Sequence, residues 1–310
     1  MGNYLNTPIT EKHMSKGSST LFDYVAAEMQ GWRLTMEDAI ITEPGFDEEI
    51  SLFAIFDGHG GSEVSEFCAK NFGNTLKSNA YYVKGKYRHA LEETFLKMDE
   101  MLRNIGKGDE DYESIKNTNA GCTALVCLIV KKKVYIANAG DCRCIIFNDT
   151  GIIYQMNREH KPTDKEEFER IRDGGGFVIN GRINENLNLS RAIGDLSFKD
   201  NPNLDQKNQL IIAFPDVVEK ELDKQDVCIL LGCDGVFEKL SDHMLKDTIF
   251  RKMKLNWSLE DIIQLMMDKC LGDKRMSHLG LDNMSSILIK FKAFGGVFGR
   301  ERIRGSSSGH

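Results

Sequence analysis

The sequence predicts an α+β fold in which two antiparallel sheets pack against each other and helices cover them. The first observation is a series of short runs rich in β-branched and aromatic residues, separated by tight turns such as the one at 148–151. The run at 123–130 is apolar at consecutive positions, so its strand is expected to be covered on both faces. The predicted strands are 51–57, 123–130, 133–139, 142–148, 151–156, 216–222, 226–234 and 285–291.

The second observation is a set of amphipathic stripes with helical spacing between these runs. Apolar residues recur at helical intervals over 64–76, after Ser62, and again over 87–102. Ser258 is expected to cap a third helix over 259–270. Thr163 and Glu166 form a capping box that is expected to open a short helix, which the glycines at 174–176 must end.

Composition indicates one globular domain. Of the 310 residues, 41% are apolar and 28% are charged, which is typical of a folded chain. No Pro-rich or Ser-rich linker divides the interior, so we expect one folded domain at 21–295, an N-terminal extension at 1–20 and a flexible tail at 296–310. We expect a monomer.

Net charge and the spacing of the cysteines disfavour several classes of protein. The net charge of −7 disfavours nucleic acid as a partner. The eight cysteines contain no C-x-x-C pair, which disfavours a zinc cage and favours a reducing, intracellular compartment without separating cytoplasm from nucleus. No apolar run is long enough to cross a membrane. N-myristoylation at Gly2 stays open, although Asn6 stands where that motif has Ser or Thr.

The distinctive feature is the position of the acidic residues. Desolvating an ionised carboxylate costs several kcal/mol unless the charge is paired or binds metal, so Asp and Glu rarely adjoin apolar strands. Here they stand at the ends of apolar runs, at Glu37, Asp38, Asp57, Asp141, Asp234 and Asp282. Each alone is equally well explained as a turn former. As a set they predict a metal site, and oxygen ligands select hard ions such as Mg²⁺ or Mn²⁺. Spacing alone leaves calcium or a nuclease site open.

Seven motifs carry a resemblance to a known family. They are Gly31-x-Arg33-x-x-Met36-Glu37-Asp38, Phe56-Asp57-Gly58-His59-Gly60-Gly61, Gly121-Cys122-Thr123-Ala124, Ala139-Gly140-Asp141-x-Arg143, Leu189-Ser190-Arg191-Ala192-Ile193-Gly194-Asp195, Cys233-Asp234-Gly235 and Asp282-Asn283-Met284. In this order they resemble the type 2C metal-dependent serine/threonine protein phosphatases. The opening residues look closest to the gamma-type members, but the short segment 104–119 lacks their acidic insertion.

The resemblance implies a four-layer α-β-β-α sandwich with a dinuclear metal site at one end. It implies two Mg²⁺ or Mn²⁺ ions per chain, with Asp57 bridging both and the Gly58 carbonyl binding one of them. Glu37, Asp234 and Asp282 are expected to bind the other ion. Asp38 and Thr123 are expected to place waters.

The resemblance also assigns the remaining roles. Arg33 is expected to hold the substrate phosphate, since a guanidinium fork matches phosphate oxygens. His59 is expected to be the general acid that protonates the leaving oxygen. Asp141, with the residue at position 238, is expected to offer a weaker third metal site. Glu238 replaces the usual Asp there, which leaves the third ion open, and 158–186 matches the family's flap.

The implied reaction is hydrolysis of phosphoserine and phosphothreonine in proteins by a water activated between two divalent cations. No cysteine is followed by an arginine six residues later, the spacing of thiol-dependent phosphatases. Three alternatives remain at this stage: a pseudophosphatase that binds phosphoproteins without turnover, a metal-dependent phosphohydrolase of small molecules or polynucleotides, and a calcium-binding structural domain.

Overall fold

A computed structural model of the protein describes residues 4–105 and 120–292. Gly2, nearly all of the short segment 104–119, and the predicted tail 296–310 lie outside the described residues.

The first of two large sheets is five-stranded, in the order β14-β8-β7-β4-β3. All of its neighbouring strands are antiparallel. Its strands are β3 (Ala39–Asp47), β4 (Ile50–Phe56), β7 (Ala124–Val130), β8 (Lys133–Ala139) and β14 (Asp216–Glu221).

The second large sheet is six-stranded, in the order β1-β2-β16-β15-β9-β10, and is also antiparallel throughout. Its strands are β1 (His13–Ser18), β2 (Phe22–Met29), β9 (Arg143–Asn148), β10 (Ile153–Gln155), β15 (Asp226–Gly232) and β16 (Met284–Phe291).

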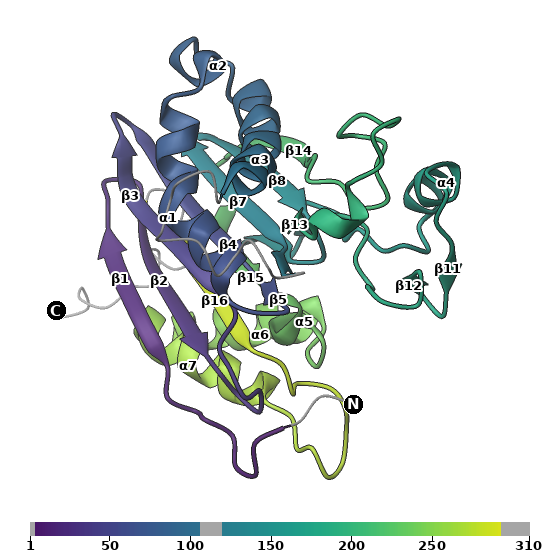
Figure 1. Ribbon diagram of the computed structural model, residues 1–310. Helices are drawn as coiled ribbons and strands as arrows, with labels where there is room; N and C mark the ends of the chain where they lie inside the picture. The colour runs from purple at the N-terminus through teal and green to yellow at the C-terminus, as the bar shows by residue number, and fades with distance from the viewer. Residues whose placement is uncertain (1–3, 106–119, 293–310) are drawn as a thin grey trace, which may run out of the picture.

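Helices cover the outer face of each sheet, which gives four layers (Figure 1). Helices α1 (Glu63–Lys77) and α3 (Tyr87–Asn104) contact the five-stranded sheet, with the short α2 (Ala80–Val83) between them. On the other side α7 (Leu259–Cys270) contacts β2 and β16, and α6 (Asp242–Lys254) packs on α7. A short α5 (Asp234–Phe237) follows β15. The predicted α+β sandwich is therefore confirmed.

Alternation along the central strands explains why both faces are apolar. In β7, Leu125, Cys127 and Ile129 belong to the core shared with the six-stranded sheet. The intervening Val126 and Leu128 belong to the core shared with α1 and α3. Because successive side chains point to opposite faces, a strand between two cores must be apolar at every position.

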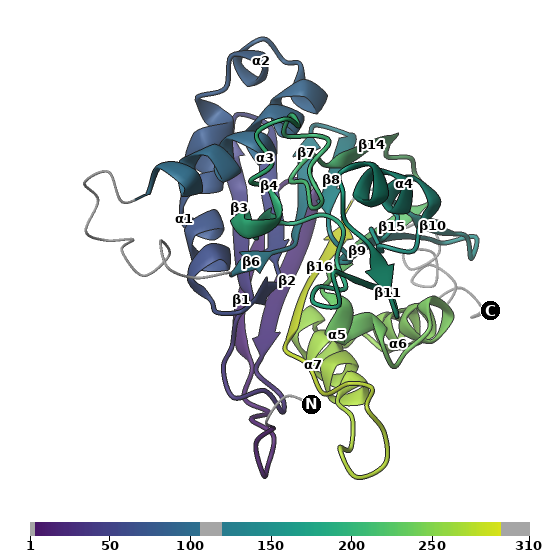
Figure 2. The same ribbon diagram turned by 45° about the vertical axis from the view of Figure 1, so that its right-hand side comes forward.

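Small elements complete the fold at one side. A three-stranded sheet joins β13 (Ile193–Gly194), β6 (Gly121–Cys122) and β5 (Gly58–His59). A lobe holds α4 (Lys165–Asp173), β11 (Val178–Ile179) and β12 (Arg182–Ile183), and a 3₁₀ turn over Leu196–Phe198 follows β13. The lobe is set to one side of the sheets in Figure 1 and comes forward in Figure 2.

All eight predicted strands are present, with ends displaced by at most two residues. Helices are found over the three predicted stripes, and the Ser258 hydroxyl accepts a hydrogen bond from the Asp261 amide as expected of a cap. The predicted Thr163 cap was wrong: α4 begins one residue later, with Asp164 at the N-cap. The Asp164 carboxylate instead accepts from the Lys161 amide at 3.1 Å, which turns the chain before the helix.

Strands β1, β2 and β3 and helix α6 were not predicted. Strand β1 is polar and almost wholly exposed, so it lacks an apolar pattern, and it lies within the segment expected to be an N-terminal extension. Strand β2 is buried at consecutive positions but contains two alanines and two acidic residues, which hide the pattern. All eight cysteines are buried and free of disulfides. Among the described helices, none combines the length and apolarity that spanning a membrane requires.

Candidate active site

The strand ends of the five-stranded sheet bring four of the predicted residues to one edge. Asp38 precedes β3, Asp57 follows β4, Thr123 precedes β7 and Asp141 lies just beyond β8. In an antiparallel sheet the end of one strand lies beside the start of its neighbour, so these positions adjoin one another. The Thr123 amide donates to the Asp57 carbonyl at 2.9 Å, and the Asp57 amide donates to Thr123 Oγ1 at 3.2 Å.

The six-stranded sheet contributes two more carboxylates by the same geometry. Asp234 follows β15 and Asp282 precedes β16, and these strands are paired antiparallel. Ligand atoms of Asp57, Cys233 and Asp234 all lie within 4.8 Å of one another. The site therefore sits where the ends of the two sheets meet.

Asp38 connects the two sheets. Its Oδ2 accepts a hydrogen bond from Ser285 Oγ of β16 at 2.7 Å. Its Oδ1 is buried and has no hydrogen-bond partner among the described residues. Burial, together with the charge of Asp282, outweighs the Ser285 hydrogen bond and raises the pKa of Asp38 to about 7. A buried carboxylate oxygen without a partner is costly unless a cation or an ordered water faces it.

The electrostatics of the cluster favour bound cations. Burial, followed by the charges of Asp38, Asp234, Asp141 and Asp282, raises the pKa of Asp57 well above its usual range. Burial and the neighbouring carboxylates raise the pKa of Asp234 in the same way. Such groups ionise at neutral pH only if positive charge offsets their repulsion. The donors are oxygens apart from one thiol, so the residues fit Mg²⁺ or Mn²⁺.

Glu37 lies beside the turn that carries Gly58. Its Oε2 accepts from the Gly61 amide at 3.2 Å and its Oε1 from Thr35 Oγ1 at 2.8 Å. A Cβ at Gly58 would lie 2.1 Å from the Glu37 carbonyl oxygen, so only glycine allows this approach. The contacts place Glu37 with Gly58, whereas the sequence analysis grouped it with Asp234 and Asp282.

Asn283, to which the sequence analysis gave no role, holds the segment with the predicted phosphate ligand. Its side-chain amide donates to the carbonyls of Gln30 at 2.8 Å and Thr35 at 3.0 Å. Its Oδ1 accepts from the Glu37 amide at 3.0 Å. Asn283 thereby fixes both ends of the loop that carries Arg33. Its place next to Asp282 was the available signal, since residues flanking a ligand often orient it.

Arg33 reaches the cluster from this loop. Its guanidinium forms an ion pair with the Asp282 carboxylate, and the Arg33 side chain is 45% exposed. The predicted phosphate-binding residue therefore lies at the open side of the site, in contact with a predicted metal ligand.

His59 is held by a residue whose role the sequence analysis missed. Its Nε2 lies 2.8 Å from Oδ2 of Asp195, whose side chain is 2% exposed. A Cβ at Gly121 would lie 2.3 Å from Asp195 Oδ2 and 2.8 Å from His59 Nε2, so glycine there leaves room for the pair. The signal was available: Asp195 ends the short apolar run Ala192-Ile193-Gly194, as the other site aspartates end theirs.

The residues expected at a third ion have other partners. The Asp141 carboxylate forms an ion pair with the Lys161 ammonium, from the predicted flap segment. Glu238 Oε2 accepts from the Gly280 amide at 3.0 Å. Each carboxylate thus has a partner within the chain, and a third ion at Asp141 and Glu238 stays a prediction.

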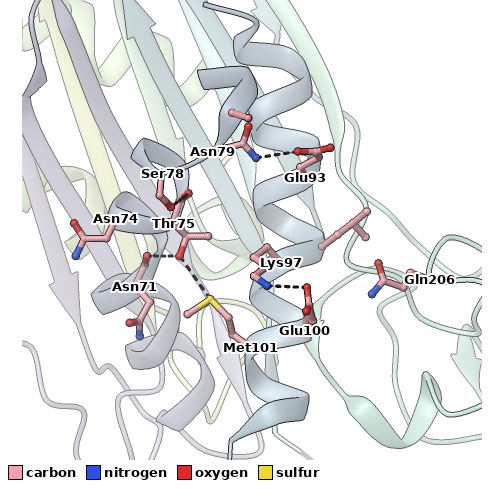
Figure 3. Close-up of a pocket in the computed structure, with 12 residues that line it drawn as sticks. Asn71, Asn74, Thr75, Ser78, Asn79, Glu93, Lys97, Glu100, Met101 and Gln206 are labelled. Carbon is pink, nitrogen blue, oxygen red and sulfur yellow. Dashed lines mark hydrogen bonds and ion pairs between the residues drawn. The ribbon is translucent and has the colours of Figure 1, made fainter. Parts of the chain in front are cut away.

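A separate cavity lies between α1 and α3, away from this cluster. Its volume is about 700 Å³, and polar side chains such as Asn79, Glu93 and Lys97 line it (Figure 3). Asn79 donates to Glu93 at 3.0 Å, and Lys97 donates to Glu100 at 2.9 Å. These polar groups satisfy one another, and the cavity contains none of the predicted site residues.

Comparison with known proteins identifies relatives over nearly the whole chain. The family model "Protein phosphatase 2C" matches residues 22–278. The chain is 44% identical over 299 residues to "Protein phosphatase 2C 1" of Paramecium tetraurelia, which covers 93% of this chain and 99% of the relative. It is 35% identical over 331 residues to "Probable protein phosphatase 2C 21" of Arabidopsis thaliana, covering 94% and 93%. A crystal structure of a phosphatase from a pathogenic strain of Toxoplasma gondii superposes with a TM-score of 0.74 at 27% identity, covering 91% of this chain and 96% of that one.

Proposed function

The chain belongs to the protein phosphatase 2C family and is therefore a metal-dependent protein serine/threonine phosphatase. From this premise we propose a role for each residue of the site in metal binding, substrate binding or catalysis. The observation that carries the proposal is the cluster of buried carboxylates at the sheet edge. The pKa values of Asp57 and Asp234 are raised well above the usual range by burial and mutual repulsion, and Asp38 keeps a buried oxygen without a partner.

We propose that this cluster binds two divalent cations. Asp57 would bind both ions, Asp234 and Asp282 would bind one, and the Gly58 carbonyl would bind the other together with Glu37, whose carboxylate contacts the 58–61 turn. When bound, the cations supply the positive charge that activates a water and offsets charge on the phosphoryl oxygens. Asp38 and Thr123 orient water at the sheet edge.

The chain's remaining groups act on the substrate. Arg33 binds the phosphate through its guanidinium, exchanging the Asp282 carboxylate for phosphoryl oxygens. His59 donates a proton to the departing seryl or threonyl oxygen, and Asp195 holds the ring in place. Phosphoproteins are the substrates. The relatives are named protein phosphatases, which disfavours the small-molecule alternative, and the expected donors of a two-cation site are present, which disfavours a pseudophosphatase.

Substituting the carboxylates that we propose as metal ligands tests the proposal. Asp57→Asn and Asp234→Asn should each abolish Mn²⁺-dependent release of phosphate from a phosphoserine peptide while leaving the circular dichroism spectrum unchanged. Asp247→Asn, at an exposed position of α6, is the matched control and should keep full activity. Full activity of the wild-type chain in EDTA would contradict metal dependence. A panel of phosphoserine, phosphothreonine and phosphotyrosine peptides beside small phosphate esters tests the substrate class.

Two further properties belong to this proposal. We propose that the chain acts inside the cell, which the eight buried free cysteines support. We also propose that it acts as a monomer, which sedimentation equilibrium would test.

A further inference from the structure

The carboxylate of Asp141 already has a cation beside it. Its Oδ2 is paired with the ammonium of Lys161, and the side chain of Asp141 is only 4% exposed. Glu159 Oε2 lies 3.7 Å from the same ammonium. A buried carboxylate paired in this way has its charge offset without a metal ion.

Backbone contacts fix the position of Lys161. The amide of His160 donates to the Gly140 carbonyl at 3.0 Å, and the Gly140 amide donates back to His160 Nδ1 at 3.2 Å. Asn138 Nδ2 also donates to the Arg158 carbonyl at 3.0 Å. These hydrogen bonds connect the residues next to Asp141 with those next to Lys161. The pair therefore lies at the start of the predicted flap segment, 158–186.

The ammonium acts on the whole cluster as well as on Asp141. Its buried partner Asp141 belongs to the same cluster of carboxylates as Asp57 and Asp234. Offsetting the charge of Asp141 therefore reduces the repulsion that Asp234 experiences.

The second expected ligand of a third ion is engaged elsewhere. Glu238 is exposed, and its Oε2 accepts from the Gly280 amide. A third cation beside Asp141 would have to displace the Lys161 ammonium, and Glu238 would offer it only the oxygen that the Gly280 amide does not occupy. The residues present do not fit a third metal ion.

We propose that the Lys161 ammonium is the third cation of this site, so that the chain binds two divalent metal ions and Lys161 excludes a third. The inference rests on the proposed two-cation function. Because Lys161 belongs to the predicted flap segment, that segment contributes a positive charge that offsets the carboxylates of the site.

Counting bound Mn²⁺ on the full chain tests the proposal. Equilibrium dialysis followed by elemental analysis should give two Mn²⁺ per wild-type chain at saturation. Lys161→Met removes the ammonium and keeps the length of the side chain, so it should bind a third, weaker Mn²⁺. Lys165→Met, at an exposed position nearby in α4, is the matched control and should bind two.

A second variant keeps the test decisive if Lys161→Met does not fold. Asp141→Asn should bind two Mn²⁺, as the wild type does, because Asp141 is not a metal ligand in this proposal. The proposal would be overturned if the wild type bound three Mn²⁺ and Asp141→Asn bound two. It would also be overturned if Lys161→Met folded and bound only two Mn²⁺. A wild-type chain that binds fewer than two Mn²⁺ and releases no phosphate would instead overturn the proposed function.

Discussion

His59 Nε2 lies 2.8 Å from Oδ2 and 3.0 Å from Oδ1 of Asp195, so one carboxylate orients the imidazole. Asp195 is buried and adopts a left-handed backbone conformation with φ of 48°. Its amide donates to the Ala120 carbonyl at 3.0 Å. Because Asp195 occupies Nε2, Nδ1 is the ring nitrogen left for proton transfer. Asp195 is thus a positioning residue for the proposed acid.

Replacing Asp195 should slow only the reactions that need the acid. We expect Asp195→Asn to lower kcat on a phosphoserine peptide by about 10- to 100-fold, within the usual contribution of general acid catalysis. Hydrolysis of p-nitrophenyl phosphate should change less, because nitrophenolate leaves without a proton. His59→Gln should show the same preference, and the double variant should be little slower than His59→Gln alone.

The kcat ratio of the two substrates is the measurement. Asp200→Asn, at an exposed position in the same loop, is the control and should leave the ratio unchanged. Equal slowing on both substrates would show that Asp195 serves only the fold.

Metal should stabilise the chain through Asp57. In the wild type, Mn²⁺ at about 100 times its dissociation constant should add about 2.7 kcal/mol to the free energy of unfolding. In the metal-free protein, burial together with Asp38 and Asp234 disfavours the ionised form of Asp57, which costs stability at neutral pH. Asp57→Asn has no ionisable group at this position, so it should raise the Tm of the metal-free protein and eliminate the Mn²⁺-dependent increase.

Differential scanning fluorimetry in EDTA and in MnCl₂ measures both effects. Asp247→Asn serves as the control and should keep the wild-type response. If Mn²⁺ still raised the Tm of Asp57→Asn by the full amount, Asp57 would not be a metal ligand.

Most of the sandwich was predictable because its central strands lie between two cores. Strand β7 is apolar at consecutive positions for this reason, and its pattern stands out in the sequence. Strand β1 is an exposed edge strand, held by backbone pairing with β2. Backbone hydrogen bonds leave no apolar pattern in a sequence, so this strand could not be predicted in the same way.

The site was predictable where a carboxylate ends an apolar strand, as at Asp57 and Asp234. The contact between His59 and Asp195 could not be predicted, because the two residues lie 136 positions apart in the sequence. The Lys161 pair was missed for a different reason. A lysine in a polar loop is normally solvated, and only the fold shows that it faces Asp141.

Arg33 should act on binding more than on turnover. Arg33→Ala removes the guanidinium at the open side of the site, and we expect the KM for a phosphoserine peptide to rise about tenfold, equivalent to about 1.4 kcal/mol. Arg33→Lys should recover only part of this loss, since an ammonium lacks the planar fork. Inhibition by inorganic phosphate should weaken in parallel. Arg172→Ala, which removes an exposed arginine of α4, is the control, and an unchanged KM in Arg33→Ala would remove its role in phosphate binding.

Glu167 should make the attachment of α4 sensitive to acid. Its Oε1 accepts from Arg191 Nε at 3.0 Å, and Arg191 in turn donates to Asp216 Oδ1 at 2.8 Å. Burial alone raises the pKa of Glu167, but Arg191 and Arg170 outweigh it and lower that pKa to about 2.

Because the folded-state pKa lies below the ordinary value near 4.5, Glu167 contributes stability that is fully present above pH 4.5. That contribution, on the order of 3 kcal/mol, is lost as the pH falls toward 2. Glu167→Gln should therefore be less stable than the wild type at pH 7, and the difference should shrink as the pH falls from 5 to 2.

Urea unfolding across this pH range measures the difference in the free energy of unfolding. Glu169→Gln, at an exposed position on the same helix, should follow the wild type at every pH. A difference between Glu167→Gln and the wild type that stays constant from pH 5 to pH 2 would mean that ionisation of Glu167 does not stabilise the fold. The lost stability would then come from packing alone, since packing of the side chain does not depend on its protonation.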